Sequence, residues 1–167
     1  MKRLTILSIT VVLLAFGAFA QDRPLSPPAK AEGKVGNATI TVDYGAPSMR
    51  GREIFGGLVP YDKVWRTGAN AATTLVTDAD IVLGDLEVPK GTYTLFTFPG
   101  KDEWTLIVSS ETGQWGSRYD EAKDFGRTKM KVKALDEAVE TFEIRVKSDA
   151  LTLAWEKTKA SVPVKAK

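Results

Sequence analysis

The sequence predicts an all-β protein, an antiparallel β-sandwich or jelly-roll-like domain with one short helix; a closed β-barrel is the alternative. About seven to nine short segments alternate between apolar and polar residues, which is the period of a half-buried strand. Turn residues, chiefly Gly, Pro and Asp, separate these segments at the short spacings typical of antiparallel sheets. The single segment with helical character is too short to connect parallel strands.

The first residues, 1–20, have the layout of a secretory signal peptide. Lys2 and Arg3 precede an apolar run over residues 4–17, and Ala18-Phe19-Ala20 forms a cleavage site of small residues. The apolar run is shorter than the roughly 20 residues that cross a bilayer, so we expect cleavage and no membrane span afterwards. The prediction is an exported protein, periplasmic or extracellular.

Composition narrows the chemistry that the exported chain can perform. Loss of Lys2 and Arg3 lowers Lys+Arg from 23 to 21, which equals the 21 Asp+Glu, so we expect no nucleic-acid partner. Cys and His are both absent. Their absence excludes Ser-His-Asp and Cys-His catalysis and the usual zinc, copper and non-haem iron sites. We expect no cofactor, and the sequence does not specify an oligomeric state.

Strands are most clearly marked in the first half of the chain. Residues 39–44 alternate, with Ile40, Val42 and Tyr44 on one face. Residues 92–98 and 104–108 are rich in β-branched and aromatic side chains, and a Pro-Gly turn joins them, which predicts a hairpin. Further short strands are expected at 72–76, 81–83 and 86–88.

The same signals predict the domain boundaries and the elements in the second half of the chain. Residues 21–33, which hold three prolines, predict a flexible leader, residues 34–156 the β-sandwich domain, and residues 157–167 a charged, frayed tail. Ser117 and Asp120 have the spacing of a helix cap, which predicts one short helix near residues 117–125. Three alternating strands are then expected at 129–134, 142–146 and 151–155.

The segment at residues 50–70 shows no strand or helix period, although it is rich in Arg, Gly and aromatic residues. A long ordered loop of this kind in a compact domain is often functional. Guanidinium groups hold carboxylate, phosphate or sulfate, rings stack on sugars, and an Asn amide both donates and accepts. The candidate ligand-binding residues are Arg50, Arg52, Tyr61, Trp65, Arg66 and Asn70, with Trp115 expected to be partly exposed near a pocket.

A purely structural interpretation of the same loop competes with binding. Arg52 or Arg66 would then form an internal ion pair with Asp43, Glu53 or Asp62. Trp65 would close one end of the sandwich and Asn70 would cap a turn.

Two groups of acids are candidates for a metal site and for a pair of catalytic acids. Asp78, Asp80, Asp85 and Glu87 lie near one turn, but they lack the order of a calcium loop, so we expect a solvated turn and no metal. Glu103 beside Trp104, and Tyr119-Asp120 with Asp124, would be paired acids of a glycoside hydrolase if they converged. Catalytic residues are not identified.

Three motifs give a resemblance to a known family. They are V-W-R-T-G-A-N-A-A-T at 64–73, V-P-K-G-T-Y-T-L-F-T-F-P at 88–99 and W-T-L-I-V at 104–108. With their surroundings, over residues 34–146, they resemble the bacterial secreted family called domain of unknown function 2911. This resemblance implies export, most often from Bacteroidetes-like bacteria, and an all-β fold. It implies no activity.

These observations favour an exported bacterial β-sandwich protein that binds a small polar ligand, a glycan or an envelope partner through loop 50–70. One alternative is a His-free hydrolase that uses carboxylates or Tyr; another is a structural or assembly module of the cell envelope. Catalysis is the less favoured of these functions.

Overall fold

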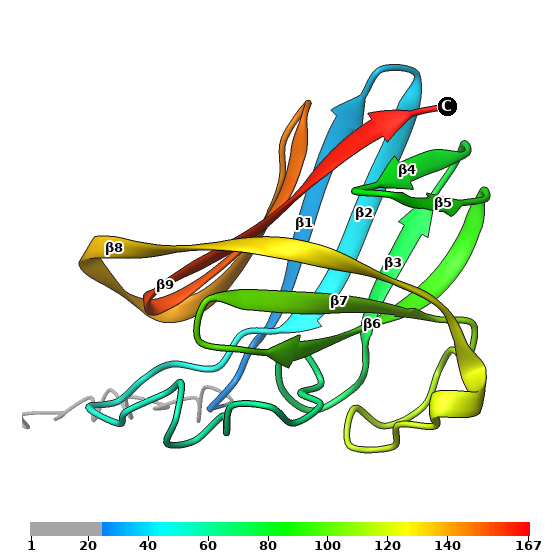
Figure 1. Cartoon of the computed structure of the whole chain (residues 1–167). Helices are drawn as coiled ribbons and strands as arrows, with labels where there is room; N and C mark the ends of the chain where they lie inside the picture. The colour runs from blue at the N-terminus through cyan, green and yellow to red at the C-terminus, as the bar shows by residue number, and fades with distance from the viewer. Residues whose placement is uncertain (1–24) are drawn as a thin grey trace, which may run out of the picture.

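In the described part of the chain, nine strands form one antiparallel sheet with almost no helix (Figure 1). The computed structural model describes residues 25–167, so the predicted signal peptide and residues 21–24 lie outside the described part of the chain. The strands run in the order β1-β2-β3-β6-β7-β8-β9-β4-β5 across the sheet. Their bounds are β1 Pro28–Val35, β2 Ala38–Gly45, β3 Thr73–Thr77, β4 Ile81–Leu83, β5 Leu86–Val88, β6 Gly91–Pro99, β7 Glu103–Ser109, β8 Asp124–Val146 and β9 Ala150–Ala166.

The sheet bends into two layers through its long strand β8. The first part of β8 pairs with β7 and the second with β9, with register shifts between Ala134 and Val139 and between Val139 and Glu143. At the open side, β1 lies so close to β8 that a Cβ on Gly33 would be 2.5 Å from the carbonyl oxygen of Val146, so glycine is needed there. The edge strands β1 and β5 are not joined. The all-β, sandwich-like fold is confirmed, and the sheet is not a closed barrel.

One apolar core lies between the two layers. Strand residues two apart point to the same face of a sheet, and here the inward ones are apolar. In β2 they are Ile40, Val42 and Tyr44, and in β9 they include Leu151, Leu153 and Trp155. The described residues, 25–167, include no helix long and apolar enough to cross a membrane.

Both predicted flexible ends are wrong where the structure describes them. The leader extended to residue 33, but β1 begins at Pro28 and pairs with β2, with Ala31 and Val35 buried. The tail from residue 157 continues β9, which pairs with β8 and β4. In β1, Ala, Gly and Val alternate with Lys and Glu, and in the tail Thr, Ala and Val alternate mainly with Lys. The charged residues therefore concealed a true period of two.

Other predicted elements were found with altered bounds. The strands at 129–134 and 142–146 are two parts of β8. The predicted helix is the 3₁₀ turn η1 Glu121–Lys123, and its N-cap is Asp120, whose side chain accepts from the amide of Ala122. The helix is a single 3₁₀ turn, in which the amides of Lys123 and Asp124 donate to the carbonyls of Asp120 and Glu121.

The packing of β9 gives a test of the corrected tail. Val162 is fully buried, so Val162→Ala should lower the free energy of unfolding by about 2 kcal/mol through lost apolar contact and a residual cavity. Lys165 is exposed on the same strand, and Lys165→Ala should change it by no more than about 0.5 kcal/mol. Urea denaturation followed by circular dichroism measures both. Equal stability of the two variants would contradict the packing of this tail.

Candidate functional site

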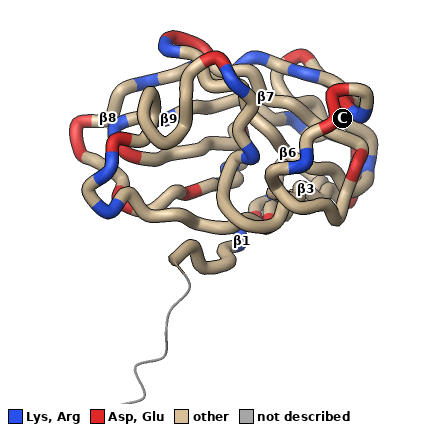
Figure 2. Tube along the Cα trace, turned by 90° about the horizontal axis from the view of Figure 1, so that it is seen from below, with Lys and Arg blue, Asp and Glu red and all other residues tan. Residues whose placement is uncertain are grey.

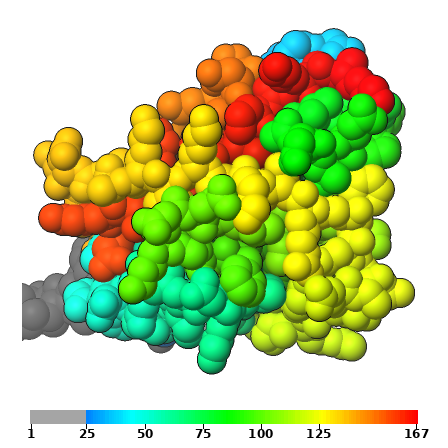
Figure 3. All heavy atoms as spheres, viewed as in Figure 1, coloured from blue at the N-terminus to red at the C-terminus, as the bar shows by residue number. Residues whose placement is uncertain are grey.

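Loop 50–70 lies at one end of the sandwich, in the chain between β2 and β3 (Figure 1). In the space-filling view it packs against β6 and β7, beside the segment that leads to η1 (Figure 3). Backbone hydrogen bonds join the two segments: the amide of Gly116 donates to the carbonyl of Asn70 at 3.1 Å, and the amide of Ala72 donates to that of Gln114 at 3.3 Å. As predicted, residues 50–70 contain no strand.

Trp65 is fixed by backbone bonds to β6 and by the aromatic core. Its amide donates to the carbonyl of Thr97 at 2.7 Å, and the amide of Thr97 donates back at 2.9 Å. Its ring stacks on Trp155 with centroids 5.9 Å apart and meets Phe142 edge-on at 5.1 Å. Trp65 therefore closes this end of the core, as the structural interpretation of the loop expected.

Thr67, two residues further on, has a strained backbone. Its φ is 55°, although it is β-branched and completely buried. Its hydroxyl donates to Thr97 Oγ1 at 3.1 Å, and its carbonyl accepts from the hydroxyl of Thr73 at 2.8 Å. Such strain costs about 1–3 kcal/mol and concentrates at functional sites. The two hydrogen bonds of Thr67 hold this conformation, and with it the short stretch that carries Trp65 and Arg66.

Arg66 lies on the wall of a cavity of about 290 Å³ that is formed between the loop, β6 and the segment before η1. The side chain is half-buried, and the structure records no hydrogen bond or ion pair for its guanidinium within residues 25–167. None of the lining residues is acidic. They are Leu58, Val59, Pro60, Val64, Trp65, Arg66, Phe96, Gly116, Ser117 and Tyr119.

Gly116 makes room for the stem of Arg66. A Cβ at this position would lie 2.9 Å from Arg66 Cδ and 2.7 Å from the carbonyl oxygen of Asn70. Since the Asn70 carbonyl is fixed backbone, a larger residue would have to displace the Arg66 side chain. The glycine thus leaves room for the Arg66 stem to pass along this segment.

Three other predicted ligand residues make contacts within the protein. Arg52 donates through Nε to the carbonyl of Met49 at 2.9 Å and through Nη2 to that of Ser48 at 2.7 Å. Arg50 donates to the carbonyl of Leu25 at 3.0 Å, and Asn70 Nδ2 donates to that of Ser26 at 3.1 Å. The contacts of Arg50 and Asn70 tie the chain just before β1 to the loop, and those of Arg52 lie within the loop and the residues before it.

The structural interpretation of the arginines also needs correction. Neither Arg52 nor Arg66 pairs with Asp43, Glu53 or Asp62 in the described chain, because Arg52 bonds to carbonyls and Asp43 pairs with Lys30 at 3.1 Å. Asn70 does hold a neighbouring segment, because its side-chain amide donates to the carbonyl of Ser26, just before β1.

Tyr61 and Trp115 are near the cavity without lining it. Tyr61 is half-buried, packs on the core, and lies 3.1 Å from where a Cβ on Gly56 would be. Trp115 is 55% exposed, and its backbone forms an isolated bridge with Ala71. The expected partial exposure of Trp115 is found, and it lies immediately before the cavity residue Gly116.

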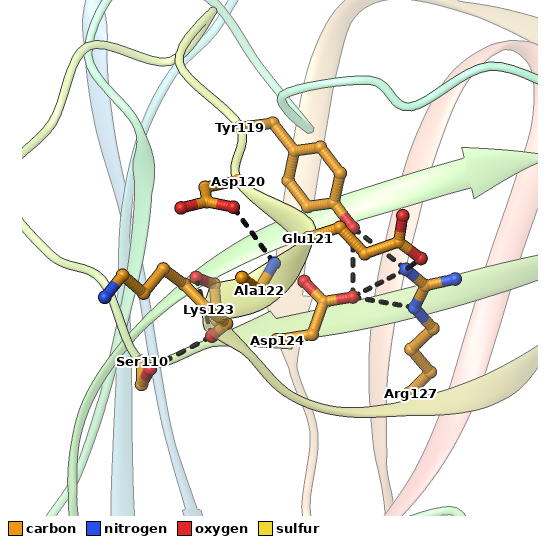
Figure 4. A network of polar contacts seen from close by, with 9 residues as sticks. Ser110, Tyr119, Asp120, Glu121, Ala122, Lys123, Asp124 and Arg127 are labelled. Carbon is orange, nitrogen blue, oxygen red and sulfur yellow. Dashed lines mark hydrogen bonds and ion pairs between the residues drawn. The ribbon is translucent and has the colours of Figure 1, made fainter.

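A polar network supports the wall formed by Tyr119 (Figure 4). The Tyr119 hydroxyl donates to Asp124 Oδ2 at 2.9 Å and accepts from Arg127 Nη2 at 3.0 Å. Arg127 also pairs with Asp124 at 2.7 Å and with Glu121 at 2.7 Å. Burial and, next, the bond to Asp124 raise the pKa of Tyr119 to about 12. The hydrogen bond to Asp124 is the main cause of a raised pKa of Arg127.

This network bears on the paired-acid hypothesis. Asp124 is engaged by Tyr119 and Arg127, while Asp120 is exposed and caps η1. A phenol with a raised pKa stays protonated near neutral pH, which makes it a poor base. Tyr119 and Asp124 do meet beside a cavity, where Asp124 Oδ2 bonds to Tyr119 and Arg127, while Asp124 Oδ1 is buried with no recorded hydrogen bond among the described residues.

The acids near the β4 turn have separate partners. Asp78 accepts from the amide of Thr39 at 2.6 Å, which is the main reason its pKa is lowered. Asp80 accepts from the amide of Lys90, Asp85 from the hydroxyl of Thr128, and Glu87 pairs with Lys167. No group of three or more such side chains within residues 25–167 is arranged to hold a metal ion.

The sequence did not single out several residues of the cavity. Leu58, Val64, Phe96 and Ser117 were not among the predicted ligand residues, although they line it. Phe96 carried one available signal, because it is apolar on the opposite face of β6 from Tyr93 and Leu95, yet is buried. An apolar residue on the outer face predicts that something covers that face, and here Tyr119 meets the Phe96 ring edge-on at 4.9 Å, beside the loop.

Acidic and basic residues are interspersed along the trace, with no single-sign band (Figure 2). The fold and cavity thus define a sandwich-like all-β protein with a hollow between loop 50–70, β6 and the segment before η1. The family model described as "Protein of unknown function (DUF2911)" matches residues 26–164, so the chain belongs to this family. No curated protein and no solved structure matches the chain. The match confirms the family resemblance and includes nearly all of β1 and β9.

The contrasting contacts of two arginines give a stability test. Arg52→Met removes two hydrogen bonds to carbonyls and should lower the free energy of unfolding by about 1 kcal/mol. Arg66→Met keeps the apolar stem and breaks no recorded bond, so it should change stability by no more than about 0.5 kcal/mol. Thermal and urea unfolding would contradict this account if Arg66→Met were the more damaging change.

The raised pKa of Tyr119 predicts a pH dependence. Its folded pKa of about 12 exceeds the ordinary value of 10.0, so its contribution to stability is complete below about pH 10 and is lost as pH rises through about 12. The free energy of unfolding should therefore fall more steeply for the wild type than for Tyr119→Phe in this window. Parallel curves for the two proteins would show that the phenol is not held as described.

Proposed function

We propose that this protein is exported and that it binds a small ligand bearing a carboxylate, phosphate or sulfate group, with Arg66 as the anchor. Support for export is the signal-peptide pattern of residues 1–20. Support for binding is one observation: the half-buried residue Arg66 lies at a cavity whose lining holds no acid, and no side-chain bond is recorded for it in the described chain.

A charged group held partly out of water is costly unless it is paired. Most long charged side chains avoid this cost by turning into solvent. Arg66 is kept at the wall instead, by the fixed backbone of Trp65, the strained Thr67 and the close contact with Gly116. An anion in the cavity would supply the missing partner, and a guanidinium can hold it through two parallel hydrogen bonds.

The rest of the cavity suits the remainder of such a ligand. Phe96, Leu58 and Val64 give apolar surface, and Ser117 adds a hydroxyl that can donate or accept. A volume of about 290 Å³ lies just below the range for small-molecule sites, about 300–1,000 Å³. The ligand is thus of the size of one ring or one acidic sugar, and a long glycan or a folded partner would engage only the rim.

Titration calorimetry with phosphate, sulfate, acetate and glucuronate tests the proposal, with glucose as the neutral control. At least one anion should bind saturably, and Arg66→Met should weaken it about tenfold or more, equivalent to about 1.4 kcal/mol or more. The anion affinity of Arg66→Lys, which keeps the charge but loses the planar guanidinium with its paired donors, should lie between those of the wild type and Arg66→Met.

Lys63→Met is the matched control, because it removes one positive charge from an exposed position of the same loop outside the cavity lining. It should leave the affinity unchanged. The proposal fails if no anion binds saturably, or if Lys63→Met weakens binding as much as Arg66→Met does.

A further inference from the structure

We infer that the ligand is an amphipathic anion, with its charged group on Arg66 and an apolar chain or ring extending over the mouth of the cavity. This inference rests on the proposed anion site and names the class of ligand. It is carried by exposed apolar side chains at the same cavity. Leu58 is 49% exposed and Val64 is 38% exposed, and both line it.

Single exposed apolar residues are common on protein surfaces and need no special function. Here, however, Leu58 and Val64 line the same cavity as the half-buried residue Arg66. A wholly polar anion such as phosphate would use Arg66 and leave this rim in water. An anion with an apolar substituent would use both, since burial of apolar surface is favourable.

The turn that carries Leu58 is well anchored. The amide of Val59 donates to the carbonyl of Ile54 at 2.8 Å, and the amide of Gly56 donates to the carbonyl of Val59 at 2.9 Å. Ile54 is completely buried and Phe55 nearly so, which fixes the base of the turn in the core. Leu58 is therefore presented to solvent by a rigid support, and little conformational entropy would be lost when a ligand covers it.

Two positions in this turn require glycine. Gly56 has a φ of 98°, and a Cβ on Gly57 would lie 2.6 Å from the carbonyl oxygen of Glu53. The amides of Ile54 and Phe55 point to the carboxylate of Glu156 at 3.5 and 3.4 Å. Glu156 itself has a φ of 52° at an irregular part of β9. Two glycines and the left-handed backbone of Glu156 thus support a turn whose tip is apolar.

Val64 is held in a comparable way. Its neighbour Trp65 is bonded to Thr97, and the amide of Asp62 donates to the carbonyl of Pro99 at 2.9 Å. The stretch between these bonds is fixed along the edge of β6, with Val64 beside the cavity. Because the hollow accommodates a charged group and only a few carbon atoms, the rest of the ligand would lie against Leu58 and Val64.

The test measures affinity for acetate, butyrate, hexanoate and octanoate, below the concentration at which they form micelles, with octan-1-ol as the neutral analogue. Affinity should rise about two- to fourfold per methylene until the chain passes the rim, and then level off. Octan-1-ol should bind at least tenfold more weakly than octanoate. Arg66→Met should weaken all the carboxylates by a similar factor.

Leu58→Ser and Val64→Ser should flatten the dependence on chain length and leave acetate binding unchanged. Val76→Ser is the matched control, because Val76 is also 38% exposed but lies on β3 outside the cavity lining. It should leave the dependence intact. Thermal unfolding of each variant, to verify that it folds, accompanies the titrations.

The outcomes separate this inference from the proposed anion site. If acetate and hexanoate bind equally well and both require Arg66, the amphipathic ligand is wrong and the anion site stands. If no carboxylate and no inorganic anion binds, both proposals fail. Equal binding of octan-1-ol and octanoate would show a purely apolar site and would overturn the role assigned to Arg66.

Discussion

The pair of backbone hydrogen bonds between Trp65 and Thr97 determines the arrangement at this end of the sandwich. Strand β3 pairs with β6 only as far as Leu95, so the loop takes over the edge of β6 at Thr97. Successive residues of an extended chain point to opposite faces. Trp65 therefore enters the aromatic core, and Arg66 turns to the outer face, where the loop and the segment before η1 enclose a cavity.

Stability and binding thus depend on adjacent residues with separate roles. Trp65 fills the core against Trp155 and Phe142, and the strained Thr67 holds the following turn through bonds to Thr97 and Thr73. Arg66, between them, has no recorded side-chain hydrogen bond or ion pair among residues 25–167. A natural protein rarely maintains backbone strain next to a half-buried, unpaired cation without a compensating gain, which is the physical reason for assigning a ligand to this position.

Alternation and turn residues were enough to predict the sandwich-like fold and to find the irregular loop, because both are local properties. Charged strands at the two ends were missed, since Lys and Glu on the solvent side of β1 and β9 resembled disorder. The roles of the loop arginines could not be predicted. Arg52 finds its partners three and four residues away, whereas the surroundings of Arg66 come from Phe96 and Gly116, which only the folded chain brings together.

The most direct measurement of the central claim is the NMR resonance of the Arg66 Nε–H group during titration with hexanoate. The account predicts a large, saturable shift for Arg66, because its guanidinium gains a partner on binding. It predicts little change for Arg52, whose Nε–H already donates to the carbonyl of Met49. An unchanged Arg66 resonance, or equal small shifts of every arginine, would show that Arg66 does not anchor a ligand.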